Sequence, residues 1–208
     1  MKLGQGSSLR LVESPRSELA SMTEKIFTLA NQLTLLRLLL IPFFALAILA
    51  GHYDWGLGVL VAAALTDFFD GLLARRLEQR TALGMTLDPI ADKLLLSTAF
   101  IVLAVRGAVP WWLSILVLSR DALILVIAVA LILGTGFRTF PPTLWGKACT
   151  TAQMLTVVGA VLVGVVPSPS LGVVKELLLW VTAALTVVSG VHYAYRTAKH
   201  PFEPARDA

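Results

Sequence analysis

The sequence carries little charge and a single cysteine. Charged residues make up 14% of its 208 residues, whereas 57% are hydrophobic, and the mean hydropathy is +0.80. This leaves too little polar surface for a water-soluble globule, so we expect an integral membrane protein. The lone Cys149 excludes an internal disulfide and a cysteine-based zinc site, and we expect it to be a small packed residue. The net charge of +4 is small, and we expect no nucleic-acid partner.

Long apolar runs that do not alternate with polar residues predict helices. We therefore expect an all-α integral membrane protein with six transmembrane helices, preceded by a short interfacial amphipathic helix. The expected parts are a flexible cytoplasmic tail at 1–15, the interfacial helix at 16–28, a six-helix catalytic domain at 29–197 and a cytoplasmic tail at 198–208. The spans are expected near 31–50, 56–80, 88–106, 111–134, 147–166 and 171–195.

The lysines and arginines predict the orientation. Six spans would place both termini and the loops at 75–87 and 135–146 on one side, and that side holds twelve of the 17 basic residues. Because short cytoplasmic loops are rich in lysine and arginine, we expect a multi-pass protein of the inner (cytoplasmic) membrane whose 75–87 loop faces the cytoplasm.

Four aspartates stand out between positions 67 and 92. Carboxylates at membrane depth are costly unless something compensates them, so four together indicate a metal site, a proton-transfer task or both. Asp67, Asp70, Gly71 and Ala74 follow at i, i+3, i+4 and i+7, which places two carboxylates and two small residues on one helix face. Arg75 comes next, and its planar fork of donors suits phosphate oxygens.

The second half of this segment adds Asp88 and Asp92, spaced i and i+4. We expect a loop through Gly84, then Asp88 as the cap and Pro89 in the first turn of the third span. Oxygen ligands without cysteine or a histidine pair favour Mg²⁺ or Mn²⁺, which bind a few carboxylates together with substrate phosphates. A nucleotide pyrophosphate is the natural partner of such a site.

The spacing Asp67-x2-Asp70-Gly71-x2-Ala74-Arg75-x8-Gly84-x3-Asp88-x3-Asp92 resembles the signature of the CDP-alcohol phosphatidyltransferase family at all eight positions. The resemblance implies six transmembrane helices, with the motif at the cytoplasmic side of the second and third, and a homodimer. It implies transfer of the phosphatidyl group from CDP-diacylglycerol to a polar alcohol, with release of CMP.

The resemblance also implies roles for individual residues. Asp67, Asp70 and Asp88 would bind divalent metal ions together with Asp92, and Asp92 would be the general base. The expected CDP-lipid site consists of Asn31, Thr34, Gly71, Ala74, Arg75 and Gly84.

The acceptor alcohol is predicted from basic residues in or beside the spans. An anionic acceptor such as glycerol 3-phosphate would need a second phosphate site. The segments 31–37, 74–76 and 146–153 are similar to the bacterial phosphatidylglycerophosphate synthase branch, whereas Ser119-Arg120-Asp121 is similar to the cardiolipin synthase branch. Transfer to phosphatidylglycerol or to an inositol phosphate is therefore an alternative. The candidate acceptor-phosphate residues are Arg37, Lys93, Arg120, Arg138 and Lys147.

Other interpretations of these residues remain open. Arg120 could pair with a carboxylate that compensates its burial, and Lys93 could extend to the membrane interface. Arg120 and Asp121 are sequence neighbours, and we expect them to point in different directions. Intramembrane aspartates also occur in ion- or proton-coupled transporters, although the position of the motif at one face and the lack of a repeat favour an enzyme. Close helix packing is expected at four glycines: Gly56, Gly58, Gly159 and Gly164.

Overall fold

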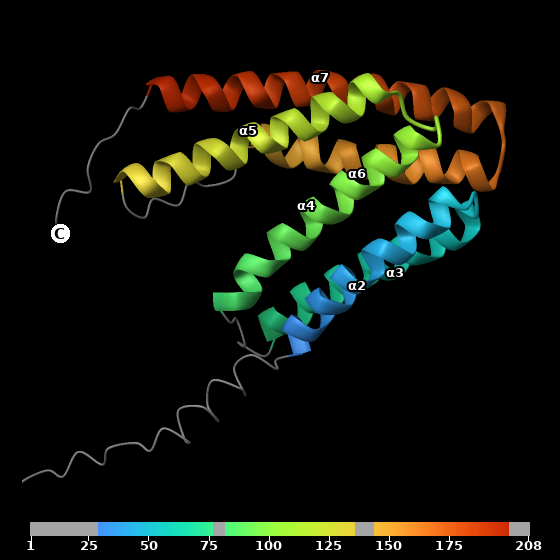
Figure 1. The fold of residues 1–208 in the computed structure, drawn as a ribbon, viewed down its shortest axis with the longest axis horizontal. Helices are drawn as coiled ribbons and strands as arrows, with labels where there is room; N and C mark the ends of the chain where they lie inside the picture. Colours follow the sequence, from blue (N-terminus) through green and yellow to red (C-terminus); the bar gives the residue numbers. More distant parts are fainter. Residues whose placement is uncertain (1–28, 77–81, 136–143, 200–208) are drawn as a thin grey trace, which may run out of the picture.

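The computed structural model describes residues 29–76, 82–135 and 144–199, without the side chains of 29–31, 68–76, 82–89, 128–135 and 196–199. These residues form six α-helices and no strand, as the apolar runs predict (Figure 1). The expected interfacial helix at 16–28 lies outside the described residues. The helices are α2 (Leu29–Leu49), α3 (Tyr53–Arg76), α4 (Ala82–Val105), α5 (Trp111–Thr135), α6 (Leu144–Val165) and α7 (Pro169–Lys199).

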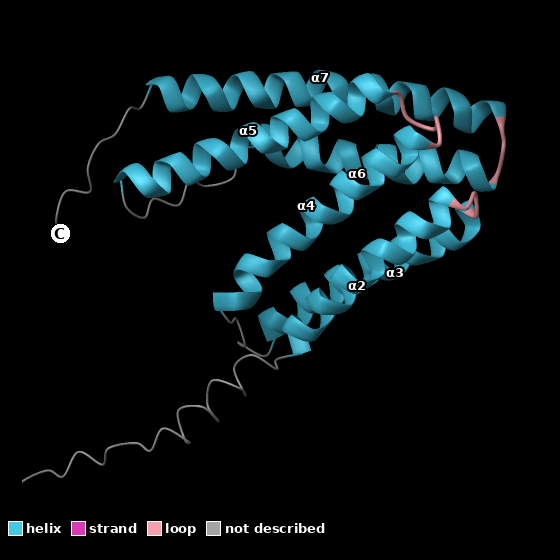
Figure 2. Ribbon diagram, viewed as in Figure 1, coloured by secondary structure: helices cyan, strands magenta, loops and turns pink. Residues whose placement is uncertain are grey.

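Three short connections, at 50–52, 106–110 and 166–168, join the helices at one end of the bundle (Figure 2). Gly51 and Gly107 stand in the first two of them with φ of 86° and 70°, values that favour glycine. The carboxyl end of α3 and the amino end of α4 point the other way (Figure 1). The aspartate motif therefore lies toward the end opposite the short turns.

The start of α4 corrects one prediction. The helix begins at Ala82 rather than at Asp88, so Gly84 belongs to the helix instead of a loop, and Asp88 and Pro89 lie in its interior. Proline lacks the N–H that a helix would bond to the carbonyl four residues earlier. Membrane helices in general tolerate this loss, because neighbouring groups and local adjustments satisfy the freed backbone, and α4 is expected to be such a helix. Similarly, α6 starts at Leu144, inside the expected loop.

The core lies where α2, α4 and α6 meet. Phe44, Ile48, Phe100, Leu103 and Val157 are fully buried. α2 packs against α3 and α4, α3 also contacts α6, and α7 packs on α6 and α5. The site-bearing helices α3 and α4 are thus both held by α2.

Two of the predicted packing glycines show why a small residue is needed. A Cβ atom at Gly56 would collide with Ile48, and one at Gly164 would collide with the ring of Tyr53. A Cβ at Gly159 would make a tight contact of 3.1 Å with Leu178 Cδ1, whereas a Cβ at Gly58 would meet nothing within 4 Å. The packing prediction is therefore confirmed for three of the four glycines and is wrong for Gly58.

Buried hydroxyl groups connect α6 to α7. Thr156 Oγ1 lies 2.8 Å from Thr182 Oγ1, and Cys149 Sγ lies 3.5 Å from Thr186 Oγ1. Cys149 is fully buried, as expected for a packed small residue. Such hydrogen bonds hold helices together where surrounding lipid removes the hydrophobic drive for association.

Three helices are long and apolar enough to cross a membrane within the described residues: Gln32–Leu49 of α2, Leu144–Val165, and Pro169–Tyr195 of α7. α3, α4 and α5 have 24, 24 and 25 residues, or about 36 Å of helix. Large apolar side chains such as Leu46 and Val173 are 65% and 70% exposed, which suits a lipid-facing surface. Six membrane spans remain a prediction.

Candidate active site

Arg37 of α2 connects the two helices that carry the aspartate motif. Its Nη2 atom lies 2.7 Å from Asp67 Oδ1 on α3, and its Nη1 atom lies 2.7 Å from Asp92 Oδ1 on α4. These distances are typical of charge-assisted hydrogen bonds. One guanidinium group therefore holds a carboxylate from each half of the motif.

The arginine is buried and the two aspartates are not. The Arg37 side chain is 1% exposed, whereas those of Asp67 and Asp92 are 52% and 47% exposed. A metal ion or a substrate can therefore reach both carboxylates from outside, while the guanidinium supports them from inside the bundle. The donors on this exposed side are carboxylate oxygens, which suit a hard divalent cation.

The backbone register agrees with the predicted motif geometry. Positions 67, 70, 71, 74 and 75 all lie on α3, and positions 84, 88 and 92 all lie on α4. The i, i+3, i+4, i+7 pattern on the first helix and the i+4 spacing on the second therefore hold. No group of three metal-binding side chains occurs among the described ones, which leave out those of Asp70 and Asp88.

A second charged network lies beside the motif. Lys93 Nζ pairs with Asp121 Oδ1 on α5, and Arg120 Nη1 donates to the same oxygen at 2.8 Å. Arg120 Nη2 also donates to Ser189 Oγ on α7. The network joins α4, α5 and α7 and leaves one positive charge in excess.

This network settles three sequence-based expectations. Arg120 and Asp121 were expected to point apart, but their side chains bond directly, because a long arginine can fold back to its neighbour. The pairing of Arg120 with a carboxylate is confirmed. Lys93 is bound to Asp121 rather than extended as an anchor. The contact of Ser189 with Arg120 could not be predicted from the sequence, because only the packing of α7 on α5 brings the two residues together.

The remaining predicted residues are only partly described. Thr34 is buried one helical turn before Arg37, and Lys147 is exposed near the start of α6. Arg138 lies outside the described residues, as do several side chains of the expected metal and CDP-lipid sites: Asn31, Asp70, Gly71, Ala74, Arg75, Gly84 and Asp88.

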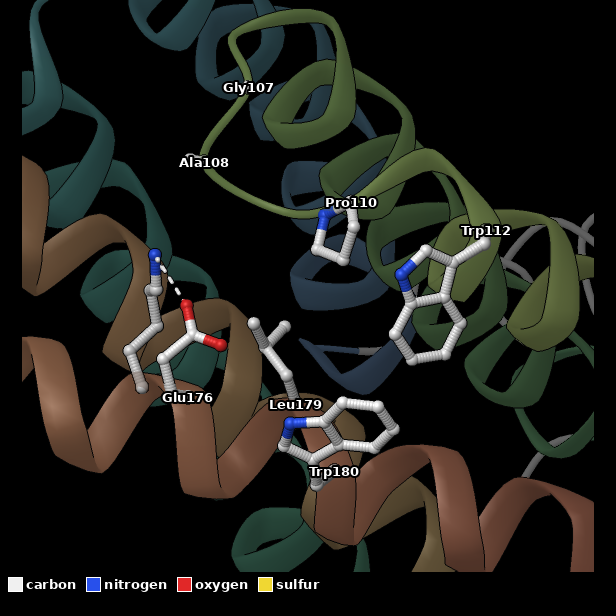
Figure 3. A pocket seen from close by; sticks show the side chains of 8 residues that line it. Gly107, Ala108, Pro110, Trp112, Glu176, Leu179 and Trp180 are labelled. Carbon is white, nitrogen blue, oxygen red and sulfur yellow. Dashed lines mark ion pairs between the residues drawn. The ribbon is translucent and has the colours of Figure 1, made fainter.

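A cavity of about 330 Å³ lies far from the aspartates, at the α4–α5 turn (Figure 3). Trp112 and Trp180 line it with ring centroids 5.6 Å apart, and Lys175, which is 19% exposed, pairs at 3.5 Å with Glu176, which is 61% exposed. Gly107 lies in this turn, after α4, which continues for about 20 Å beyond Asp92. The cavity therefore belongs to the other end of the bundle.

Known proteins resemble the chain over most of its length. A protein of Mycobacterium tuberculosis named "Probable phosphatidylglycerophosphate synthase" is 38% identical over 186 residues, which cover 84% of each chain. The CDP-diacylglycerol–glycerol-3-phosphate 3-phosphatidyltransferase of Bacillus subtilis is 36% identical, over 81% of this chain and 94% of its own. A human cardiolipin synthase (CMP-forming) is 30% identical, over 90% of this chain and 67% of its own.

The family model described as CDP-alcohol phosphatidyltransferase matches residues 27–188. That match contains both halves of the aspartate motif, Arg37, the Lys93–Asp121–Arg120 network and five helices with most of the sixth. The chain belongs to the CDP-alcohol phosphatidyltransferase family.

Proposed function

We propose that the chain transfers the phosphatidyl group of CDP-diacylglycerol to glycerol 3-phosphate and releases CMP. The observation that carries the proposal is the pair of half-exposed carboxylates, Asp67 and Asp92, brought to one guanidinium from the two helices of the family motif. Relatives named for this reaction cover most of the chain and support the acceptor.

Asp67, Asp70 and Asp88 would hold the divalent ion, Mg²⁺ or Mn²⁺, with Asp92 beside them. When bound, such an ion supplies positive charge that stabilises the pyrophosphate and the departing CMP. The fit is chemical: the four aspartates and Arg37 carry a formal charge of −3, and the described donors are oxygen atoms. The CDP-lipid would lie along the small residues of α3, Gly71 and Ala74, with Arg75 at its phosphates and Asn31, Thr34 and Gly84 nearby.

Asp92 would act as the general base. Its carboxylate accepts the proton of the acceptor hydroxyl as that oxygen attacks the phosphorus of the phosphatidyl group. The new P–O bond forms while the bond from this phosphorus to the oxygen of CMP breaks, so CMP leaves with the electron pair. The exposure of Asp92 supports this role, because a base must reach a hydroxyl that arrives from solution.

The acceptor phosphate would contact Lys93 first. Lys93 follows the base directly and is 43% exposed, whereas the Arg120 side chain is 6% exposed and bonded to Asp121 and Ser189. Arg120 would then act by holding Asp121 and, through it, Lys93. Lys147 and Arg138 remain candidates for further contacts with the phosphate.

The setting of the reaction is also part of the proposal. We place the aspartate end of the bundle at the cytoplasmic face of the inner membrane, because both substrates' polar parts and most basic residues belong there. We expect the protein to form a homodimer. We also expect each chain to be divided into two tails, an interfacial helix and a six-helix domain, with the bounds predicted from the sequence.

Transfer to phosphatidylglycerol is the second candidate. The Ser119-Arg120-Asp121 sequence supports it, as does a Mycobacterium tuberculosis relative named "Putative cardiolipin synthase", which is 39% identical over 132 residues.

The test is CMP release by purified protein in detergent with CDP-diacylglycerol and Mg²⁺ or Mn²⁺. Glycerol 3-phosphate, phosphatidylglycerol, inositol 1-phosphate and serine are offered in parallel. Fast release with glycerol 3-phosphate alone supports the proposal, and fast release with phosphatidylglycerol alone supports the second candidate. No metal-dependent CMP with any acceptor contradicts both, and ion flux in liposomes without this chemistry would favour a transporter.

A further inference from the structure

We propose that Arg37 is a positioning residue that fixes Asp67 and Asp92 relative to each other, rather than a contact for the acceptor phosphate. This inference rests on the proposed function, in which Asp67 binds metal and Asp92 takes the proton. It assigns Arg37 a role that the motif spacing alone does not contain, since Arg37 lies outside the motif.

The first support is the bonding of the guanidinium. Its two terminal nitrogens each donate to a different helix, at 2.7 Å in both cases. A guanidinium is planar and rigid, so the fork sets the separation of the two carboxylate oxygens that it holds. Because α2 packs against both α3 and α4, this fork is itself anchored.

The second support is the direction of access. Arg37 is almost completely buried behind two half-exposed carboxylates. A phosphate from solution would have to pass these two negative groups before it reached the arginine. Lys93 follows Asp92 in the sequence and is 43% exposed, so it is far more accessible to such a phosphate than Arg37 is.

The third support is electrostatic. Asp67 and Asp92 carry like charges and repel each other, and the charge of Arg37 between them compensates this repulsion. Burial of the arginine would in turn be costly without both partners. The three residues therefore form one unit, in which Arg37 sets where the metal ligand and the base stand.

The test compares Arg37→Lys with Arg106→Lys in the full chain purified in detergent. Lysine keeps the charge but is a point donor without the fork, and Arg106 offers the same exchange in the turn after α4, far from the motif. Mn²⁺ binding in the presence of CMP is followed by electron paramagnetic resonance, and CMP release is followed at varied glycerol 3-phosphate.

We expect Arg37→Lys to lower Mn²⁺ affinity and kcat by about 10–100-fold, the range seen when groups that orient metal ligands are lost. The KM for glycerol 3-phosphate should stay within about twofold, because Arg37 makes no contact with the acceptor in this proposal and its binding is therefore unchanged. Arg106→Lys should change none of the three quantities. A raised acceptor KM with unchanged Mn²⁺ affinity and kcat would overturn the proposal, as would no change at all.

A measurement on the wild-type protein covers the case in which Arg37→Lys does not fold. The ¹⁵N resonances of the Arg37 guanidinium should shift when Mg²⁺ is added with CMP, and glycerol 3-phosphate added afterwards should leave them in place. A shift caused by glycerol 3-phosphate would show an acceptor contact and refute the positioning role.

Failure of the proposed function gives a different result. If the wild type binds Mn²⁺ but releases no CMP with any acceptor, the transferase is refuted, and the Mn²⁺ affinities of the two variants still decide the role of Arg37. If the wild type releases CMP and Arg37→Lys behaves like Arg106→Lys, the positioning role alone is refuted.

Discussion

Asp121→Asn is expected to destabilise the helix bundle strongly. Asp121 is 10% exposed and accepts bonds from Lys93 and Arg120, which belong to α4 and α5. Asparagine keeps the shape of the side chain but removes its charge. The buried Arg120 would then keep two neutral acceptors, the new amide oxygen and Ser189, but would have no counter-charge among its described partners.

The size of the effect follows from burial. Removing one partner of a buried ion pair lowers the free energy of unfolding by about 3–5 kcal/mol, since the remaining charge stays out of water. Lys93 adds little, because at 43% exposure it can turn to the interface. For a chain of this length, each kcal/mol lowers Tm by about 2–4 °C, so we expect a fall of about 6–20 °C.

The assay is the thermal unfolding of the full chain in detergent, with Glu176→Gln as the matched control. Glu176 is 61% exposed and pairs at 3.5 Å with Lys175, which is 19% exposed. Because solvent screens the glutamate and the flexible lysine can extend outward, we expect Glu176→Gln to cost about 0–1 kcal/mol, or less than about 4 °C. If Asp121→Asn melts no lower than Glu176→Gln, the network does not carry the stability that we assign to it.

Other variants test the site and the packing. Asp92→Asn should abolish CMP release while CDP-lipid binding, measured by equilibrium dialysis, persists; near-normal turnover would rule out the base. Gly164→Ala should lower the free energy of unfolding by about 1–3 kcal/mol, because the new methyl collides with the ring of Tyr53. Gly58→Ala, with open space around it, is the control and should not lower Tm, since alanine is the better helix former. Thr156→Val removes two hydrogen bonds to α7, with Thr182 and with the carbonyl of Leu178, and should cost at least about 0.6–1.7 kcal/mol; an unchanged Tm would argue against these bonds. Removal of divalent ions with EDTA should stop CMP release, and added Mn²⁺ or Mg²⁺ should restore it; release that persists in EDTA would contradict the metal role.

Local spacing was enough to predict which residues share a helix, but it did not predict where each helix begins. Positions 67, 70, 71 and 74 are on α3 as the 3.6-residue period requires. Asp88-Pro89 looked like a helix start, and α4 instead begins six residues earlier. A proline removes one backbone hydrogen bond and restricts the turn around it. Whether the helix continues through the proline depends on whether neighbouring groups satisfy the freed carbonyl. Those neighbours come from the tertiary structure, so the sequence alone does not show them.

The sequence by itself determined that the protein is an all-helical membrane protein of this family, and which two helices carry the four aspartates. Composition and short-range periodicity are enough for this, because both are properties of the chain alone. The tertiary structure decided which charged side chains pair with one another. Arg37 meets Asp67 and Asp92 across 30 and 55 residues, and Lys93 meets Asp121 across 28. These contacts depend on which faces of the helices pack together, and the packing buried Arg37 against Asp67 and Asp92 and left Lys93 43% exposed.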